Sequence, residues 1–225
     1  MLNMGLIAEL TYPKKSHRKK VVLPKYSTSL AEFFGIMLGD GGINNPWQAN
    51  ITLNAIKDRE YSAYILKLCE KLFGITPAIR KRKEKQAIVI SLASTTIVDF
   101  LVAQGLPRGN KLKNGLRIPQ WILHNKEYRI ACVRGLVDTD GCIFTHKHLV
   151  NGNMYENIGL CFTSYSPELI MGVATILEEF AIIPHISGRS RNIYLYRKDM
   201  VIKYLKIFNS SNKRIRSAYK KWKGA

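Results

Sequence analysis

The sequence predicts a mixed α/β (α+β) fold made of two copies of one unit, and three observations indicate this. An apolar run that ends in Asp-Gly at 40–41 recurs one hundred residues later and ends in Asp-Gly at 140–141. Matched segments follow each run, at 50–53 and 157–160 and again around Pro77 and Pro184. The periodicity in both halves indicates one order of elements, helix–strand–strand–helix–strand–strand–helix, in tandem.

Each apolar run is expected to form a helix with one face of small residues. Gly35 and Gly39 are four positions apart, and Gly135 and Thr139 repeat that spacing. Residues four apart lie on the same helix face. Small side chains there allow a second helix to approach closely. We therefore expect the two motif helices to pack against each other and to bring the two repeats into a pseudo-two-fold arrangement.

Asp40 and Asp140 are expected to lie side by side where these helices end. The glycine after each aspartate suits a helix C-terminus. Two carboxylates at the negative ends of two helix dipoles repel each other unless a cation lies between them. This arrangement predicts a divalent metal site.

The first unit is otherwise a series of short elements. Ser29 and Glu32 have the spacing of a capping box that starts the first helix. Residues 49–54 alternate with period two, so that a polar face stays open. Asp58 is expected to cap a helix that ends at Gly74. A basic hairpin over 77–83 and 86–91 and a helix over 94–102 complete the unit.

The second unit aligns with the first at an offset of 107 beyond the motif, which makes Asn157 the counterpart of Asn50. This alignment leaves seven extra residues, which are expected to form a loop over 145–155. The chain is therefore divided into a basic N-terminal arm (1–28), a first repeat (29–104), a linker (105–117), a second repeat (118–212) and a basic C-terminal tail (213–225). The stretch 213–223 is expected to be helical and to lie outside the repeat.

Composition points to a polyanionic partner. The formal net charge is +19 and the isoelectric point is about 9.9, which favours nucleic acid first and an anionic membrane surface second. No apolar run is long enough to span a bilayer, and no secretory signal precedes the first helix. The four cysteines have no C-x-x-C spacing and lie in apolar contexts, so we expect reduced core thiols in an intracellular protein.

A duplicated chain suits duplex DNA, whose strands are related by a local two-fold axis. Two curved antiparallel sheets would flank the protein axis, and a β-ribbon fits the major groove. For each polar side chain of the open faces, exposure on an ordinary sheet is the plain alternative to base contact. The predicted DNA-binding residues are Gln48, Asn50, Thr52, Asn54, Arg80, Arg82, Lys83, Lys85, Gln86, Asn157, Arg189, Arg191, Tyr194 and Tyr196.

The motif segments 33–41 and 133–141, with the run 118–122 before the second, carry a family resemblance. The sequence resembles a monomeric, two-repeat LAGLIDADG homing endonuclease over about residues 29–215. In the first motif, Leu38 and Gly39 stand where the family usually has an acid and Ala. The last acid of the motif is present in both copies.

The resemblance implies a saddle of two αββαββα units and site-specific, double-strand DNA cleavage with 3′ overhangs, of the kind used in intron homing. It implies a Mg²⁺ site formed by Asp40, Asp140, Gly39 and Thr139. Mn²⁺ is expected to substitute, and Ca²⁺ to allow binding without cutting. The resemblance also places Lys111 and Lys213 as catalytic basic residues; phosphate contact or plain solvation is the alternative for both.

Two other functions remain open on the same scaffold. An RNA maturase that assists intron splicing would need the same basic faces, and a DNA-binding regulator would bind without cutting. An intein is disfavoured because no splicing block flanks the repeat, and a membrane-surface protein would leave the duplicated Asp-Gly helices unexplained. We favour a structural role for Asp138, the inner acid of the second motif.

Overall fold

The computed structural model describes residues 20–187 and 191–224. Each repeat forms one four-stranded antiparallel sheet, with strand order β1-β2-β4-β3 in the first and β5-β6-β8-β7 in the second. Because both sheets have the same order, the predicted tandem fold is confirmed. The first repeat comprises α1 (Thr28–Gly39), β1 (Gly41–Asn45), β2 (Gln48–Asn54), α2 (Arg59–Phe73), β3 (Ala78–Arg82), the 3-10 helix η1 (Lys83–Lys85), β4 (Ala87–Ala93) and α3 (Thr95–Ala103).

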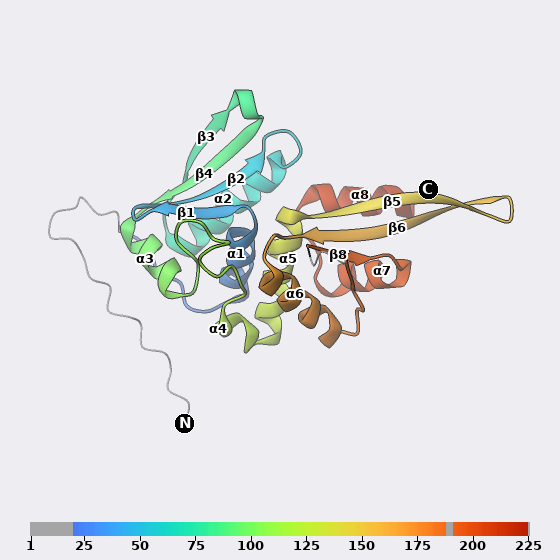
Figure 1. The fold of residues 1–225 in the computed structure, drawn as a ribbon. Coiled ribbons are helices and arrows are strands. Elements are labelled where there is room, and N and C mark those ends of the chain that lie inside the picture. Colours follow the sequence, from blue (N-terminus) through green and yellow to red (C-terminus); the bar gives the residue numbers. More distant parts are fainter. Residues whose placement is uncertain (1–19, 188–190, 225) are drawn as a thin grey trace.

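A short helix, α4 (Gln120–Leu123), leads into the second repeat. Figure 1 shows α1 and α5 next to each other at the centre of the molecule, with one sheet on either side. The second repeat comprises α5 (Lys126–Asp140), β5 (Gly141–Val150), β6 (Asn153–Thr163), α6 (Pro167–Glu179), β7 (His185–Ile186), β8 (Asn192–Leu195), α7 (Lys198–Ile207) and α8 (Lys213–Lys223).

The two motif helices touch at their glycines. A Cβ atom on Gly35 would lie 2.1 Å from the carbonyl oxygen of Cys132, and one on Gly135 would lie 2.4 Å from the carbonyl oxygen of Glu32. Real Cβ atoms do not approach backbone oxygens this closely, so any other residue would push the helices apart. The predicted packing through small residues is confirmed.

The predicted start of α1 is wrong by two residues. Ser27, not Ser29, is the N-cap, and its hydroxyl accepts a hydrogen bond from the Leu30 amide at 3.3 Å. Glu32 does not turn back to a helix start, because it is 3% exposed and binds partners in the interface between the repeats. The ion pair between Glu32 and Arg134 is stronger than the hydrogen bond that Glu32 could make as part of a capping box.

The helix α2 ends as predicted and begins differently. Gly74 ends it in the left-handed conformation, with φ of 66°. Asp58 precedes the helix, but its side chain makes no capping hydrogen bond. Instead, a carboxylate oxygen of Asp58 accepts a hydrogen bond from the Asn212 amide at 2.9 Å. This contact ties the first repeat to the segment after α7.

The predicted loop over 145–155 is a long hairpin instead. Gly41 pairs with Ile51, ten positions along the chain, whereas Gly141 pairs with Phe162, twenty-one positions along. The turn at its tip is Asn151-Gly152, whose positive φ values of 51° and 78° suit a tight hairpin turn. The strands therefore continue through the insertion, and Figure 1 shows the hairpin projecting beyond the rest of the second repeat.

This hairpin also corrects the predicted alignment of the repeats. The register makes Cys161, not Asn157, the counterpart of Asn50, because Cys161 pairs with Cys142 and Asn50 pairs with Gly42. Asn157 lies four residues farther from the motif helix. The Asn-Ile-x-Leu likeness at 50–53 and 157–160 is thus not a structural equivalence.

The two chain ends differ from the predicted arm and tail. The helix α8 has the predicted bounds, but Ile215 is 1% exposed and belongs to the core, so α8 is an integral element. Within residues 20–27, the Val22 amide donates to the Phe73 carbonyl at 2.9 Å, and Tyr26 stacks on Trp121. The rest of the arm, 1–19, lies outside the described residues. None of the helices in the described ranges is both long and apolar enough to cross a membrane.

Candidate functional site

Asp40 and Asp140 lie together at the ends of α1 and α5. Asp40 is the C-cap of α1 and Asp140 is the last residue of α5. A carboxylate oxygen of Asp140 lies 2.9 Å from the position that a Cβ on Gly39 would take, so Asp140 rests against the end of the other helix. The sequence predicted this meeting of the two carboxylates, and the packing of the helix glycines produces it.

Burial makes both carboxylates easier to protonate, and repulsion by Asp140 adds to this effect at Asp40. The pKa of Asp40 rises from 3.8 to about 7, chiefly because the group is desolvated and then because the Asp140 carboxylate is close. Desolvation also raises the pKa of Asp140 to about 6, against the effect of Lys111 and Arg214, which lower it. The site therefore favours a proton or another cation between these groups.

Lys111 lies at the C-terminal end of α1. Its ammonium donates hydrogen bonds to the carbonyl oxygens of Leu38 at 2.8 Å and Gly41 at 3.0 Å, and also to the carbonyl of Gly39. The Leu38 and Gly39 carbonyls belong to the last turn of α1, which leaves them without intrahelical partners, and Gly41 is the first residue of β1. Burial lowers the pKa of Lys111, while Asp140 and Asp40 raise it. The predicted proximity of Lys111 to the carboxylates is therefore seen.

Arg214 occupies the matching position at the end of α5. Its guanidinium donates to the carbonyl oxygens of Asp138 at 3.2 Å and Gly141 at 2.9 Å. Those residues stand one hundred positions after Leu38 and Gly41, so the two cations bind equivalent carbonyls. Arg214 also pairs with Asp58 at 3.3 Å.

Lys213 is not at this position. Its ammonium pairs with Glu60 on the surface, and more than half of each side chain is exposed. The shared Asn-Lys at 110–111 and 212–213 suggested the wrong residue, because α8 begins at Lys213 and turns the next side chain inward. Arg214 is the residue that sequence reasoning missed.

Gly39 and Thr139 lie at the helix contact. The Thr139 hydroxyl donates to the Gly135 carbonyl at 3.1 Å and to the Leu136 carbonyl at 2.9 Å. A Cβ on Gly39 would lie 2.1 Å from that hydroxyl oxygen. The Gly39 carbonyl accepts from Lys111. Both predicted ligands therefore already have partners within the protein.

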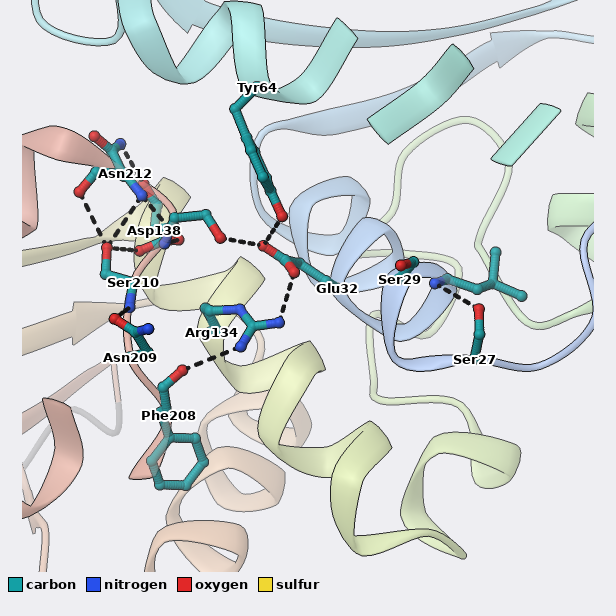
Figure 2. A network of polar contacts seen from close by, with 12 residues as sticks. Ser27, Ser29, Glu32, Tyr64, Arg134, Asp138, Phe208, Asn209, Ser210 and Asn212 are labelled. Carbon is teal, nitrogen blue, oxygen red and sulfur yellow. Dashed lines mark hydrogen bonds and ion pairs between the residues drawn. The ribbon is translucent and has the colours of Figure 1, made fainter. Parts of the chain in front are cut away.

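Glu32 is the centre of a buried polar network that joins the repeats. Figure 2 shows its carboxylate between Tyr64 and Arg134. Tyr64 donates to it at 2.8 Å, the Ser211 hydroxyl at 2.6 Å, and the Arg134 guanidinium at 2.6 Å. The interacting residues come from α1, α2, α5 and the segment after α7. The network therefore fixes the position of both motif helices.

Asp138 belongs to the same polar network as Glu32 and not to the pair formed by Asp40 and Asp140. It is 1% exposed, and its carboxylate accepts hydrogen bonds from the Ser210 hydroxyl and the backbone amides of Ser211 and Asn212. Burial raises its pKa to about 7, while these hydrogen bonds act to lower it. The structural role favoured from the sequence agrees with these contacts, which hold the entry to α8 in place.

The carboxylate pair fits Mg²⁺ in its chemistry. Among residues 20–187 and 191–224 no group of three or more His, Cys, Asp or Glu side chains could hold a metal. Mg²⁺, however, is commonly bound through one or two carboxylates, with water and substrate phosphates as its other ligands. The raised pKa values of Asp40 and Asp140 show that the protein alone leaves their negative charge incompletely compensated.

The open face of the first sheet carries most of the predicted polar residues. The strand β2 alternates as predicted, with Ile51 and Leu53 buried and Thr52 exposed. The Asn50 amide oxygen accepts from the Ser91 hydroxyl at 2.7 Å, and that of Asn54 caps the following turn. Of the other predicted residues of this repeat, Gln48 is half-buried, and four are exposed: Arg80, Arg82, Lys85 and Gln86. The side chain of Lys83 lies outside the described part of the structure.

Two of the predicted DNA-binding residues of the second sheet form an aromatic pair. Tyr194 and Tyr196 stack with ring centroids 5.1 Å apart. Arg191 is exposed and lies over the ring of Tyr165, while Arg189 lies outside the described residues. Two cysteines also differ from the predicted core thiols, because Cys142 is exposed and Cys161 is half-buried, whereas Cys69 and Cys132 are buried.

Comparison with known families gives one match for each repeat. The LAGLIDADG-like domain family matches residues 127–216, and the WhiA LAGLIDADG-like domain family matches residues 30–112. The chain belongs to the LAGLIDADG family. Its α1 and α5 are the LAGLIDADG helices, and they form the interface between the repeats.

Several solved LAGLIDADG structures share the fold. The meganuclease I-SmaMI bound to uncleaveable DNA is 10% identical and superposes with a TM-score of 0.57 over 89% of each chain. I-DmoI in complex with DNA and Ca is 16% identical, with a TM-score of 0.56 over 87% of this chain and 97% of that one. The N-terminal LAGLIDADG domain of DUF199/WhiA is 16% identical, with a TM-score of 0.54 over 82% of both chains.

A DNA polymerase of Thermococcus aggregans is 25% identical over 142 residues. The match covers 54% of this chain and 8% of the polymerase. The chain therefore corresponds to a small part of that protein.

Proposed function

We propose that this LAGLIDADG protein is a site-specific endonuclease that makes a metal-dependent double-strand cut, with 3′ overhangs, in a long duplex DNA target. The observation that carries the proposal is the pair of partly buried carboxylates, one from each repeat, at the meeting point of the two motif helices. The pseudo-two-fold arrangement supports one carboxylate for each DNA strand. The I-SmaMI and I-DmoI structures contain DNA, which supports the same substrate for this fold.

The charge of the chain supports a phosphate-rich substrate. The net charge of +19 favours a polyanion. The strand β3 is exposed along its whole length and carries Arg80, Lys81 and Arg82. In this proposal these cations and the open sheet faces bind DNA on both sides of the carboxylates. Intracellular intron homing, by a monomer, is the biological setting that we propose for this activity.

Asp40 and Asp140 would hold Mg²⁺, which supplies a more acidic bound water and charge stabilisation at the scissile phosphates. The carboxylates contribute their positions and negative charge. Lys111 and Arg214 fix the ends of α1 and α5 through carbonyl contacts and add positive charge beside the phosphates. We propose positioning roles for both cations, with Arg214 in place of Lys213.

Substitution of each carboxylate tests the proposal on sites selected by binding in Ca²⁺. Asp40→Asn and Asp140→Asn are expected to abolish double-strand cutting in Mg²⁺ while binding in Ca²⁺ is largely kept. The amide keeps the shape of the side chain but lacks the charge that holds the metal. Normal double-strand cutting by either variant would contradict the proposal. Isothermal titration of each variant with Mn²⁺ gives a second readout that does not depend on activity.

A DNA-binding regulator is the second candidate. It is favoured by the match of residues 30–112 to the WhiA LAGLIDADG-like domain and by the structural likeness to DUF199/WhiA. Selective duplex binding without cutting in Mg²⁺ or Mn²⁺ would support it. Preferential binding to intron RNA over the selected duplex would instead support an RNA maturase.

A further inference from the structure

The two sheets present different chemistry at equivalent positions. In the first sheet, one row of paired residues across the strands consists of Gly42, Asn50, Ser91 and Ala78. In the second sheet, the same row is Cys142, Cys161, Tyr194 and His185. The central hydrogen-bonding pair of the first row is thus replaced by a thiol and an aromatic ring.

Neighbouring residues extend the aromatic character of the second row. Phe144 is on the same face of β5 as Cys142, and its ring meets that of Tyr194 edge-on at 6.4 Å. The far end of the Phe144 ring occupies the space that a Cβ on Gly159 would need. Tyr196 is 47% exposed, so the cluster is open to a ligand.

The rings of this cluster cover one another's faces. Tyr194 and Tyr196 are nearly parallel, with an interplanar angle of 9°. The other neighbours are Phe144 beside Tyr194 and His185 beside Tyr196, the latter with centroids 5.6 Å apart. A ligand would therefore meet mainly the edges of these rings. This favours contact with a duplex groove over stacking of unpaired bases, which requires free ring faces.

We infer that the second sheet recognises its half of the DNA target through apolar contact with thymine methyl groups, whereas the first sheet uses hydrogen bonds. This inference rests on the proposed DNA-binding function. Thymine is the base that presents a methyl group in the major groove, where apolar side chains contact it. Asn50, Arg80 and Arg82 of the first sheet instead offer amide and guanidinium groups, which pair with adenine and guanine.

Uracil substitution tests this inference, because it removes only the methyl group of thymine. Each thymine of a selected duplex is replaced in turn by deoxyuridine, and binding is measured in Ca²⁺ with the wild-type protein. The half-site over the second sheet is marked by hydroxyl-radical cleavage from an iron chelate on Asn153→Cys at the hairpin tip. If the chelate also reacts with the exposed Cys142, DNA cleavage still marks the same half-site, because positions 142 and 153 both belong to the second repeat.

The expected result is a loss of affinity of about fourfold for each contacted methyl group, confined to the second half-site. Phe144→Ala and Tyr194→Ala should remove this loss, while Val22→Ala, on the exposed N-terminal segment, should not. Equal losses in both half-sites, or none in the second, would overturn the inference. A preference of the wild type for single-stranded nucleic acid that is lost in Phe144→Ala or Tyr194→Ala would also overturn the inference.

The two proposals can fail separately. A protein that binds duplex with the uracil effect but never cuts would contradict the endonuclease and keep the assignment of the second sheet. A protein that cuts a selected site and shows no uracil effect would support the endonuclease and contradict the assignment of the second sheet.

Discussion

Asp40 and Asp140 are the residues on which the proposed chemistry depends, and their pKa values have a consequence for stability. A carboxyl whose pKa is higher in the folded chain binds its proton more tightly there than in the unfolded chain. The free energy of unfolding therefore falls as the pH rises from the unfolded value of 3.8 towards the folded value of about 7 for Asp40. Above that pH the loss is complete.

We predict that the metal-free protein unfolds at lower urea concentration at pH 8 than at pH 5, and that Asp40→Asn reduces the difference. The amide carries no charge and removes the repulsion. Urea unfolding in EDTA measures this, with Glu178→Gln on the exposed surface of α6 as the control. An unchanged pH dependence in Asp40→Asn would show that the carboxylate pair is not strained.

Arg214 provides a second prediction at the residue scale. Arg214→Ala should slow double-strand cutting about a hundredfold, the scale of losing one positioned charge beside a reacting group. Lys213→Ala is the matched control, because the adjacent Lys213 side chain faces Glu60 at the surface. Cutting rates on one selected site, at equal bound fractions, give the comparison. An equal effect of both substitutions would show that general positive charge, not the contact with α5, matters.

The sequence was sufficient for Asp40 and Asp140 but not for the residues around them. The carboxylates follow from a repeated local motif, whose helix ends can be predicted from Asp-Gly. The contacts of Glu32 with Arg134 and of Arg214 with Asp58 join segments more than a hundred residues apart, and no local pattern indicates which partner each residue finds. This is why Glu32 resembled a capping residue and Lys213 resembled the counterpart of Lys111.

At the scale of elements, the contact between α1 and α5 sets the distance between the two carboxylates. Gly35→Ala should lower the free energy of unfolding by roughly 3 kcal/mol, since the added methyl group would meet a carbonyl of the facing helix. Gly42→Ala is the control, because no atom lies within 4 Å of its added Cβ. Urea unfolding at one pH compares them. Equal stability of both variants would contradict the close helix contact.

The hairpin of β5 and β6 shows where element prediction failed and why. Alternation of polar and apolar residues weakens towards a hairpin tip that lies in solvent on both faces, so 145–155 looked like a loop. Asn151 and Gly152 were the available signal, because both adopt the positive φ that a two-residue turn requires. The wrong register for Asn157 followed from the same error.

For the molecule as a whole, duplication explains the arrangement of the site better than either repeat alone. One repeat supplies one motif helix, one carboxylate and one sheet. Two repeats supply a pair of carboxylates on the shared axis and a positively charged molecule around it. The fold was predictable at this scale, because the repeated motif and the order of elements determine which helices meet. The different chemistry of the two open faces was not, since it depends on strand register.

The central claim is that the carboxylate pair makes this chain a site-specific nuclease. The most direct measurement is selection of cut molecules from a random duplex library in Mg²⁺, with the Asp140→Asn protein beside the wild type. We expect that the wild type alone yields one long, pseudo-palindromic site cut in both strands with 3′ overhangs. Recovery of the same cut site with Asp140→Asn, or selective binding with no cutting by either protein, would contradict it.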